Sequence, residues 1–160
     1  SISGKLTARN APLRDQKGSV YEGGTRVPTL VSWPGKIDTG ENDTPIFIAD
    51  WMPTFCKLSG FKNDRDLAWD GIDLSSLLIN GTQIAERPIY IAGPSWRACS
   101  LRIGDWKLVE SNNKQRYELY NIADDPAEKT DLAATYLERV TSMMVTLEEV
   151  RAADNDSVVK

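Results

Sequence analysis

The chain has 160 residues, of which 41% are hydrophobic and 26% are charged, and its formal net charge is −4. This composition is typical of a globular protein and excludes a disordered or fibrous chain. The acidic balance gives no overall support to a nucleic-acid-binding surface, and no stretch approaches the run of about 20 apolar residues that a membrane span needs. We therefore expect neither nucleic acid nor a membrane as a partner.

Two residue counts restrict the chemistry further. The sequence contains no histidine, which excludes a Ser-His-Asp triad and a Cys-His pair within this chain. Its two cysteines, Cys56 and Cys99, lie far apart and form no metal-binding spacing. We interpret both as buried free thiols, the usual situation of an unpaired cysteine.

The first 85 residues predict a loop, a strand and a helix in that order. Residues 1–26 are rich in Gly, Ser, Thr and charge, which favours a loop. The run RVPTLVSW (26–33) has the length and β-branched content of a strand, and the turn sequence WPGK follows it. No partner strand is evident, so this part is interpreted as the tail of a larger sheet domain.

A helix is expected over about residues 50–59. Its apolar side chains recur at helical spacing, Asp50 can cap its N-terminus, Pro53 falls in its first turn and Gly60 follows its end. A short apolar segment at residues 74–78 is closed by Asn80-Gly81.

From Arg87 the pattern changes to four short alternating runs: RPIYIAG, ACSLRIG, DWKLVES and RYELYNI. Turn residues separate them, and Gly104-Asp105 is a strong signal for a tight hairpin. Farther on, apolar residues mark one face of a long C-terminal helix that would cover the sheet: Tyr136, Val140, Met143, Met144, Leu147 and Val150. The fold class is therefore α+β, with residues 1–85 as the tail of a larger domain and residues 86–160 as a subdomain of about four antiparallel strands and a helix.

The loop sequence KGSVYEGGTRVP, which begins at Lys17, carries the main candidate site. Lys17 supplies a compact positive charge, and the glycines that follow allow close backbone approach. Such a loop can hold an anion such as sulfate or phosphate. Arg26 is interpreted as structural, tied to Glu22 or to loop carbonyls. On spacing alone, a solvated surface lysine is the simpler interpretation of Lys17, since most lysines are exposed.

A family resemblance favours the anion-binding interpretation. Residues 10–37 (NAPLRDQKGSVYEGGTRVPTLVSWPGKI) are similar to a segment of type I sulfatases of the alkaline-phosphatase-like superfamily. Four later strings resemble further motifs of that family in the same order: ADWMPTFCKLSG, WDGIDLSSLLING, GDWKLV and ELYNIADDPAEKTDLA. Together they extend over about residues 10–135. One departure is Asp15, at a position where the family often has glycine.

The resemblance implies a C-terminal part of a sulfatase, an enzyme that hydrolyses sulfate esters by S–O cleavage with a formylglycine nucleophile and a calcium ion. Lys17 would inherit the lysine that contacts the sulfate. Neither Cys56 nor Cys99 stands in the C/S-x-P-S/T-R motif that gives formylglycine, and the family's metal ligands are absent. Formylglycine and calcium would therefore both lie outside this chain, with none bound here. We expect the isolated chain to be inactive.

Several alternatives stay open from the sequence. The parent could be a related phosphatase or phosphonate hydrolase, or the chain could be a non-catalytic scaffold or interaction lobe. The sulfate ester could be a sugar, aryl or glycosaminoglycan sulfate, and the family includes periplasmic, secreted and lysosomal members. Expected partners are the substrate, the N-terminal part of the catalytic domain and, through an apolar edge near residues 27–33, a second copy of the chain. The acidic pairs Asp124-Asp125 and Glu148-Glu149 are interpreted as solvated.

Overall fold

The computed structural model describes residues 10–62, 64, 67–94, 97–111 and 116–153, which fall into two compact units. One unit, which we call the sheet unit, holds the chain up to Pro28 and again from Arg87 onward. The other, the helical unit, holds Thr29–Glu86. The sequence analysis had grouped the first 28 residues with the part that here forms the helical unit. The division of the parent protein at residues 85/86 stays a prediction.

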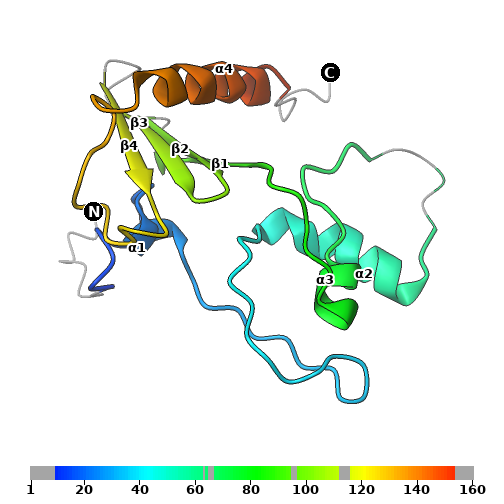
Figure 1. Ribbon diagram of the computed structural model, residues 1–160. Helices are drawn as coiled ribbons and strands as arrows, with labels where there is room; N and C mark the ends of the chain where they lie inside the picture. Colours follow the sequence, from blue (N-terminus) through cyan, green and yellow to red (C-terminus); the bar gives the residue numbers. More distant parts are fainter. Residues whose placement is uncertain (1–9, 63, 65–66, 95–96, 112–115, 154–160) are drawn as a thin grey trace, which may run out of the picture. The chain divides into compact units, whose positions relative to one another are not determined.

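The sheet unit is built on a four-stranded antiparallel sheet with the strand order β1-β2-β3-β4 (Figure 1). A two-residue turn at Gly104-Asp105 joins β2 to β3, so that Ile103 faces Trp106 across the hairpin. The predicted α+β fold class and the meander are thereby confirmed, while the turn expected at Asn112-Asn113 lies outside the described residues. The strands are β1 (Pro88–Ala92), β2 (Ala98–Ile103), β3 (Trp106–Ser111) and β4 (Arg116–Asn121).

One face of this sheet is covered by helix α4 (Leu137–Ala153), as the apolar spacing predicted (Figure 1). Met143 and Leu147 are buried at the helix–sheet contact, because the spacing of four residues places both on one side of the helix. Tyr136 precedes the helix and packs its ring on Trp106. The buried residues of this core are Cys99, Leu101, Leu108, Leu119, Met143 and Leu147.

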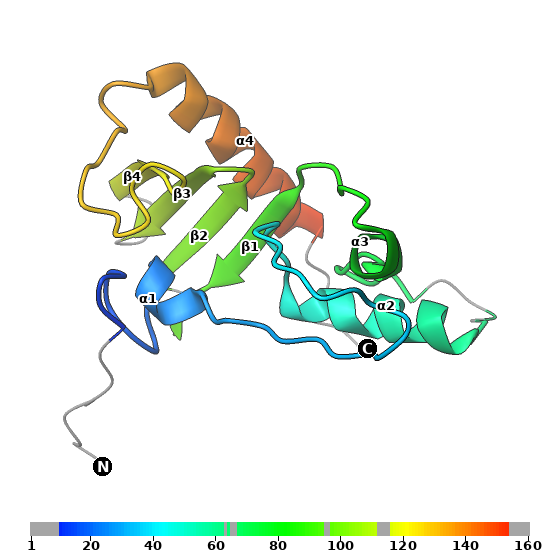
Figure 2. The ribbon, with the colours of Figure 1, turned by 60° about the horizontal axis from the view of Figure 1, so that its bottom comes forward.

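The opposite face of the sheet is covered by residues 10–28, which we call the motif loop. This segment contains the short helix α1 (Glu22–Thr25), which lies on the side of the sheet away from α4 (Figure 2). A second, smaller apolar core forms there from Val20, Val109, Tyr120 and Ile122. The sheet is therefore buried on both faces, whereas the sequence predicted a cover for only one.

The helical unit contains the 3₁₀ turn η1 (Ile48–Asp50), α2 (Trp51–Ser59) and α3 (Ser75–Asn80). The predicted helix over residues 50–59 is confirmed, but Asp50 does not cap it. The Asp50 carboxylate instead accepts the backbone N–H groups of Phe47 at 2.7 Å and Ile72 at 2.9 Å. The Thr54 hydroxyl accepts the N–H of Leu74 at 2.9 Å. One side chain of η1 and one of α2 thus fix the segment that leads into α3.

The strand predicted over residues 26–33 does not form, and this expectation was wrong for the chain as it stands. The segment is irregular, and Val27 and Leu30 are strongly exposed, at 74% and 94%. A strand is stable only when its backbone pairs with a neighbour, and no other strand pairs with this segment among the described residues. The WPGK turn does form, with Lys36 donating its N–H to the carbonyl of Trp33 at 3.0 Å. Association of two chains through this segment stays a prediction.

Candidate functional site

Lys17 lies at the tip of a tight turn in the motif loop. The Ser19 N–H donates to the carbonyl of Gln16 at 3.1 Å, which closes the turn. Gly18 has φ +92°, a conformation that this position of a type II turn requires and that glycine adopts without strain. The Lys17 side chain is exposed, and no side chain of the described residues pairs with its ammonium group. Its charge is therefore available to an anion.

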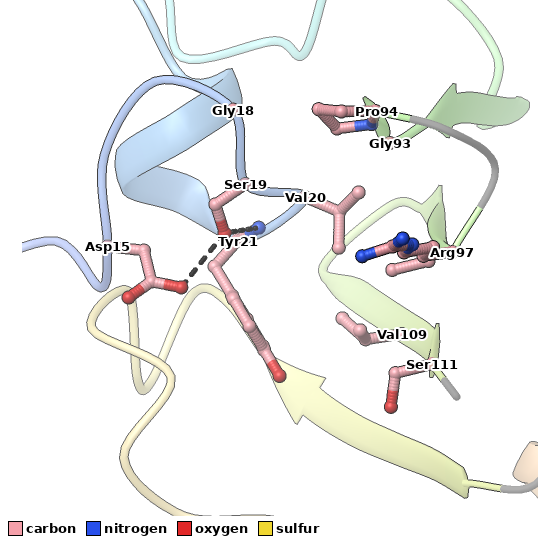
Figure 3. Close-up of a pocket in the computed structure, with 11 residues that line it drawn as sticks. Asp15, Gly18, Ser19, Val20, Tyr21, Gly93, Pro94, Arg97, Val109 and Ser111 are labelled. Carbon is pink, nitrogen blue, oxygen red and sulfur yellow. Dashed lines mark hydrogen bonds between the residues drawn. The ribbon is translucent and has the colours of Figure 1, made fainter. Parts of the chain in front are cut away.

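A cavity of about 320 Å³ adjoins this turn and is lined by residues of the sheet unit (Figure 3). Gly18 and Ser19 form part of its wall, so the Lys17 turn borders it. The Asp15 carboxylate accepts the Ser19 hydroxyl at 3.0 Å, and the Ser19 oxygen accepts the Tyr21 N–H at 3.2 Å. The remaining lining residues are Val20, Gly93, Pro94, Arg97, Ala98, Val109 and Ser111.

Two glycines hold α1 directly against the backbone of the Lys17 turn. A Cβ on Gly23 would lie 2.3 Å from the carbonyl oxygen of Arg14, and one on Gly24 would lie 2.2 Å from that of Ser19. No side chain fits at those distances, which explains the Gly-Gly pair. The Gly23 N–H also donates to the Arg14 carbonyl at 2.8 Å. Close backbone approach was the expected role of these glycines, and the structure confirms it.

The first residue of α1, Glu22, is held by a buried ion cluster. The Lys107 ammonium lies 2.8 Å from Glu22 Oε1 and 2.9 Å from Glu128 Oε1. The Glu22 N–H donates to Glu128 Oε2 at 2.7 Å, and Arg102 lies 3.6 Å from Glu22 Oε2. Burial raises the pKa of Glu128, although Lys107 opposes that shift. Two cations and two carboxylates thus compensate one another in the interior.

A second polar network anchors the start of the motif loop. The Arg14 guanidinium stacks on the Tyr21 ring, 3.6 Å from its centroid, and donates to the Tyr120 hydroxyl at 2.7 Å. Both tyrosine hydroxyls donate to Glu118 Oε2, at 2.6 Å from Tyr21 and 2.7 Å from Tyr120. Burial, followed by these hydrogen bonds to Glu118, raises the pKa of both tyrosines. The loop is therefore fixed to β4 upstream of Lys17 as well.

The structure corrects the expected partner of Glu22. Arg26 is exposed and makes no ion pair with Glu22; Lys107 and Arg102 do so from the sheet. The error arose because sequence reasoning pairs neighbours, whereas these partners lie about eighty residues away. The signal that was missed is a charged residue inside an alternating apolar strand, as Lys107 is in WKLVES and Glu118 is in RYELYN.

The remaining predicted residues take ordinary positions. Cys99 is buried and Cys56 is only half-buried, and both are free thiols. Asp124 is exposed, whereas Asp125 is half-buried and accepts the N–H groups of Lys129 and Thr130. Glu148 and Glu149 are exposed as expected, although Glu148 pairs with Arg151 at 2.7 Å.

The described residues offer no metal site and no membrane-spanning helix. Among them, no three His, Cys, Asp or Glu side chains gather in a way that could hold a metal ion. The described side chains therefore do not fit the calcium site that the resemblance implies for the parent enzyme. No described helix is both long enough and apolar enough to cross a membrane.

Comparison with known proteins gives a consistent result. The family model described as "Sulfatase" matches residues 3–61. A "Sulfatase" of Formosa agariphila is 29% identical over 142 residues, which cover 78% of this chain and 26% of the relative. "Arylsulfatase G" of Canis lupus familiaris is 27% identical over 72% of this chain and 25% of its own length. "Steryl-sulfatase" of Rattus norvegicus is 35% identical over 55% of this chain and 17% of its own length.

Solved structures agree with the sequence relatives. The crystal structure of Ps i-CgsB matches 92% of this chain with a TM-score of 0.82 and 30% identity. The match covers 34% of that protein's chain. The same protein has been solved in complex with k-i-k-neocarrahexaose. The chain thus spans about a quarter of the length of the first two curated relatives and about a third of this structural neighbour.

Proposed function

We propose that the chain is the C-terminal part of a sulfuric ester hydrolase of the sulfatase family, an enzyme that cleaves sulfate esters. The observation that carries this proposal is the family match over residues 3–61, because that segment contains the whole motif loop with Lys17. The much greater length of the relatives supports an enzyme in which this chain is one part.

Lys17 is proposed to contact the sulfate group of the substrate. Its exposed ammonium, without a partner among the described side chains, can compensate negative charge on the sulfuryl oxygens. It could also aid departure of the alcohol oxygen by donating a proton or hydrogen bond. The rigid attachment of the motif loop supports this role, since a charge stabilises a transition state only when it is held in place beforehand.

The rest of the chemistry is assigned to the part of the enzyme outside this chain. The sequence has no C/S-x-P-S/T-R motif for a formylglycine nucleophile, and the described residues do not fit a calcium site. We infer that both groups are supplied by the remaining part of the catalytic domain. The isolated chain is then inactive toward sulfate esters.

The test uses the full-length product of the gene, prepared with its formylglycine, and an aryl sulfate as substrate. Lys17→Ala should lower kcat/KM by about 10²–10³-fold, the loss typical of removing one charge-stabilising group. Lys129→Ala is the matched control, because Lys129 is also exposed but is not among the residues that line the cavity beside the Lys17 turn. Its activity should equal that of the wild type.

Three results would contradict the proposal. Unchanged turnover of Lys17→Ala removes Lys17 from the mechanism. Hydrolysis of an aryl phosphate, but not of the aryl sulfate, assigns the parent to the phosphatases. Turnover of the aryl sulfate by the isolated 160-residue chain shows that the chain carries its own nucleophile.

A further inference from the structure

The most unusual buried group in the sheet unit is the ammonium of Lys107. This side chain is only 2% exposed and projects from the central strand β3. Burying a charge costs several kcal/mol, and an ion pair only offsets that cost, so an apolar residue would often serve stability as well. A buried lysine at this position therefore indicates a requirement other than stability alone.

The geometry shows what Lys107 holds. Its ammonium bridges Glu22 on α1 and Glu128 on the loop after β4, at 2.8 and 2.9 Å. Glu128 also accepts the backbone N–H of Glu22 at 2.7 Å, so both the side chain and the backbone of the first residue of α1 are bound. The Glu128 side chain is fully buried. The beginning of α1 is therefore fixed at one point over the sheet.

A short rigid path connects this point to the Lys17 turn. Glu22 follows Lys17 by five residues, and the next two residues are the glycines whose backbone touches the carbonyls of Arg14 and Ser19. A shift of α1 is therefore passed on to the turn, because the Gly23 N–H is bonded to the Arg14 carbonyl at 2.8 Å and the backbones leave no space for even a Cβ at either glycine. Lys17 itself has no described partner that could hold its side chain.

We propose that Glu22, clamped by Lys107 and Glu128, is a positioning residue for Lys17. It acts through α1 and the Gly-Gly contact, which set where the Lys17 ammonium stands relative to the sulfate. This inference rests on the proposed role of Lys17. Glu22, the buried acidic residue of the EGG sequence, would thus affect the reaction indirectly, by fixing the position of Lys17.

The test compares two isosteric substitutions in the full-length enzyme, one on each face of the sheet. Glu22→Gln keeps the shape of the side chain but removes the charge that pairs with Lys107. Glu110→Gln is the matched control, because Glu110 is also buried and paired, with Arg151, but on the face covered by α4. Glu22→Gln should lower kcat by about 10-fold or more, within the 10²-fold loss that a misplacement of about 1 Å can cause. Glu110→Gln should leave kcat unchanged.

A double-mutant cycle separates positioning from general destabilisation. If Glu22 acts through Lys17, then Glu22→Gln should cause no further loss in the Lys17→Ala background. If the full loss recurs there, Glu22 does not act through Lys17, and the inference is overturned. If Lys17→Ala alone has no effect, it is the proposed function of Lys17 that fails. The two failures are therefore distinguishable.

Hydrogen exchange on the 160-residue chain provides a second measurement. It distinguishes a local loosening of the motif loop from a general loss of folding in the variant. Glu22→Gln should speed exchange of backbone amides in residues 10–25 by about 10-fold or more while leaving residues 137–153 protected. Glu110→Gln should instead speed exchange in residues 137–153 and leave residues 10–25 protected. Equal changes in both segments for Glu22→Gln would overturn the positioning role.

Discussion

The two faces of the sheet are stabilised in different ways. Toward α4, a continuous apolar core forms around Leu108 and Leu147, and the charged pair Glu110–Arg151 lies at its margin. Toward the motif loop, the centre of the face is ionic: Lys107 and its two glutamates are buried there, beside a smaller apolar core.

The two faces of the sheet are suited to different tasks. Apolar packing is non-directional, so the contacts on the α4 face do not fix the orientation of any one polar group. Ion pairs and hydrogen bonds from buried groups demand a fixed geometry, because a misplaced buried charge loses its compensation. Directional contacts on the α4 face include those of Glu110 with Arg151 and Tyr117. On the face that carries the candidate site, such contacts bind the motif loop itself, as expected where a side chain must be held in place.

The largest expected effect comes from breaking the ionic centre. Lys107→Met leaves the buried Glu128 carboxylate without a cation and leaves Glu22 only the more distant Arg102, at 3.6 Å. It should lower the free energy of unfolding by about 3–5 kcal/mol. Arg151→Met removes the cation of the α4 face, but Arg151 is 22% exposed, so water compensates part of the loss. A cost of about 1–2 kcal/mol is expected there. Urea unfolding followed by tryptophan fluorescence measures both.

A combined variant tests whether charge compensation is the cause. The triple replacement Lys107→Met, Glu22→Gln and Glu128→Gln leaves no charge in the buried centre, and Arg102, which loses Glu22, is 22% exposed and can be hydrated. It should recover a large part of the stability lost in Lys107→Met. An equal or larger loss in the combined variant would show that packing volume, rather than charge, dominates this face.

A smaller effect on the free energy of unfolding is expected from raising the pH, through Cys99 on the α4 face. Burial raises the pKa of the Cys99 thiol to about 11 from its ordinary value of 9.0. Above pH 9 the unfolded chain loses this proton while the folded chain keeps it, so the free energy of unfolding falls as the pH rises toward about 11. One such group contributes at most about 1.4 kcal/mol per pH unit.

The variant Cys99→Ala isolates this contribution. Tyr21, Tyr117 and Tyr120 also have a raised pKa and shift stability in the same direction, so the wild-type slope alone does not identify the thiol. Cys99→Ala should show a shallower fall of the free energy of unfolding in the same pH window. Parallel slopes for the two proteins would rule out the thiol as the titrating group.

The smallest effect concerns Asp15 in the motif loop. This residue has φ +61°, in the left-handed region where glycine is unstrained. That conformation accounts for the glycine that the family often has at this position. Asp15→Gly should raise the free energy of unfolding by a few tenths to about 1 kcal/mol, as strain relief exceeds the loss of the exposed Ser19 hydrogen bond. Asp15→Ala keeps the strain and should destabilise; equal stabilities of the two variants would contradict this reasoning.

The two faces also differ in how far they could be predicted. The meander and α4 follow from the alternation in residues 88–121 and the helical spacing around Met143 and Leu147, since a local pattern of that kind determines which side chains share a face. The strand expected over residues 26–33 failed for the opposite reason, because a strand depends on a partner that no local pattern supplies. The helix cap expected at Asp50 failed for the same reason. The Asp50 carboxylate accepts the N–H groups of Phe47 and of the distant Ile72 and not those of the first helical turn.

The sequence by itself determined the family motifs, the exposed lysine in its glycine-rich turn and the secondary structure from Arg87 onward, because each of these is encoded in residues that are close along the chain. Only the tertiary structure decided that the motif loop covers the second face of the sheet, that the Glu22 carboxylate pairs with Lys107, and that the Glu22 backbone N–H donates to Glu128. Those contacts join residues about eighty to a hundred positions apart. Many pairings of buried charges are compatible with the same sequence, and folding selects the one in which every charge is compensated.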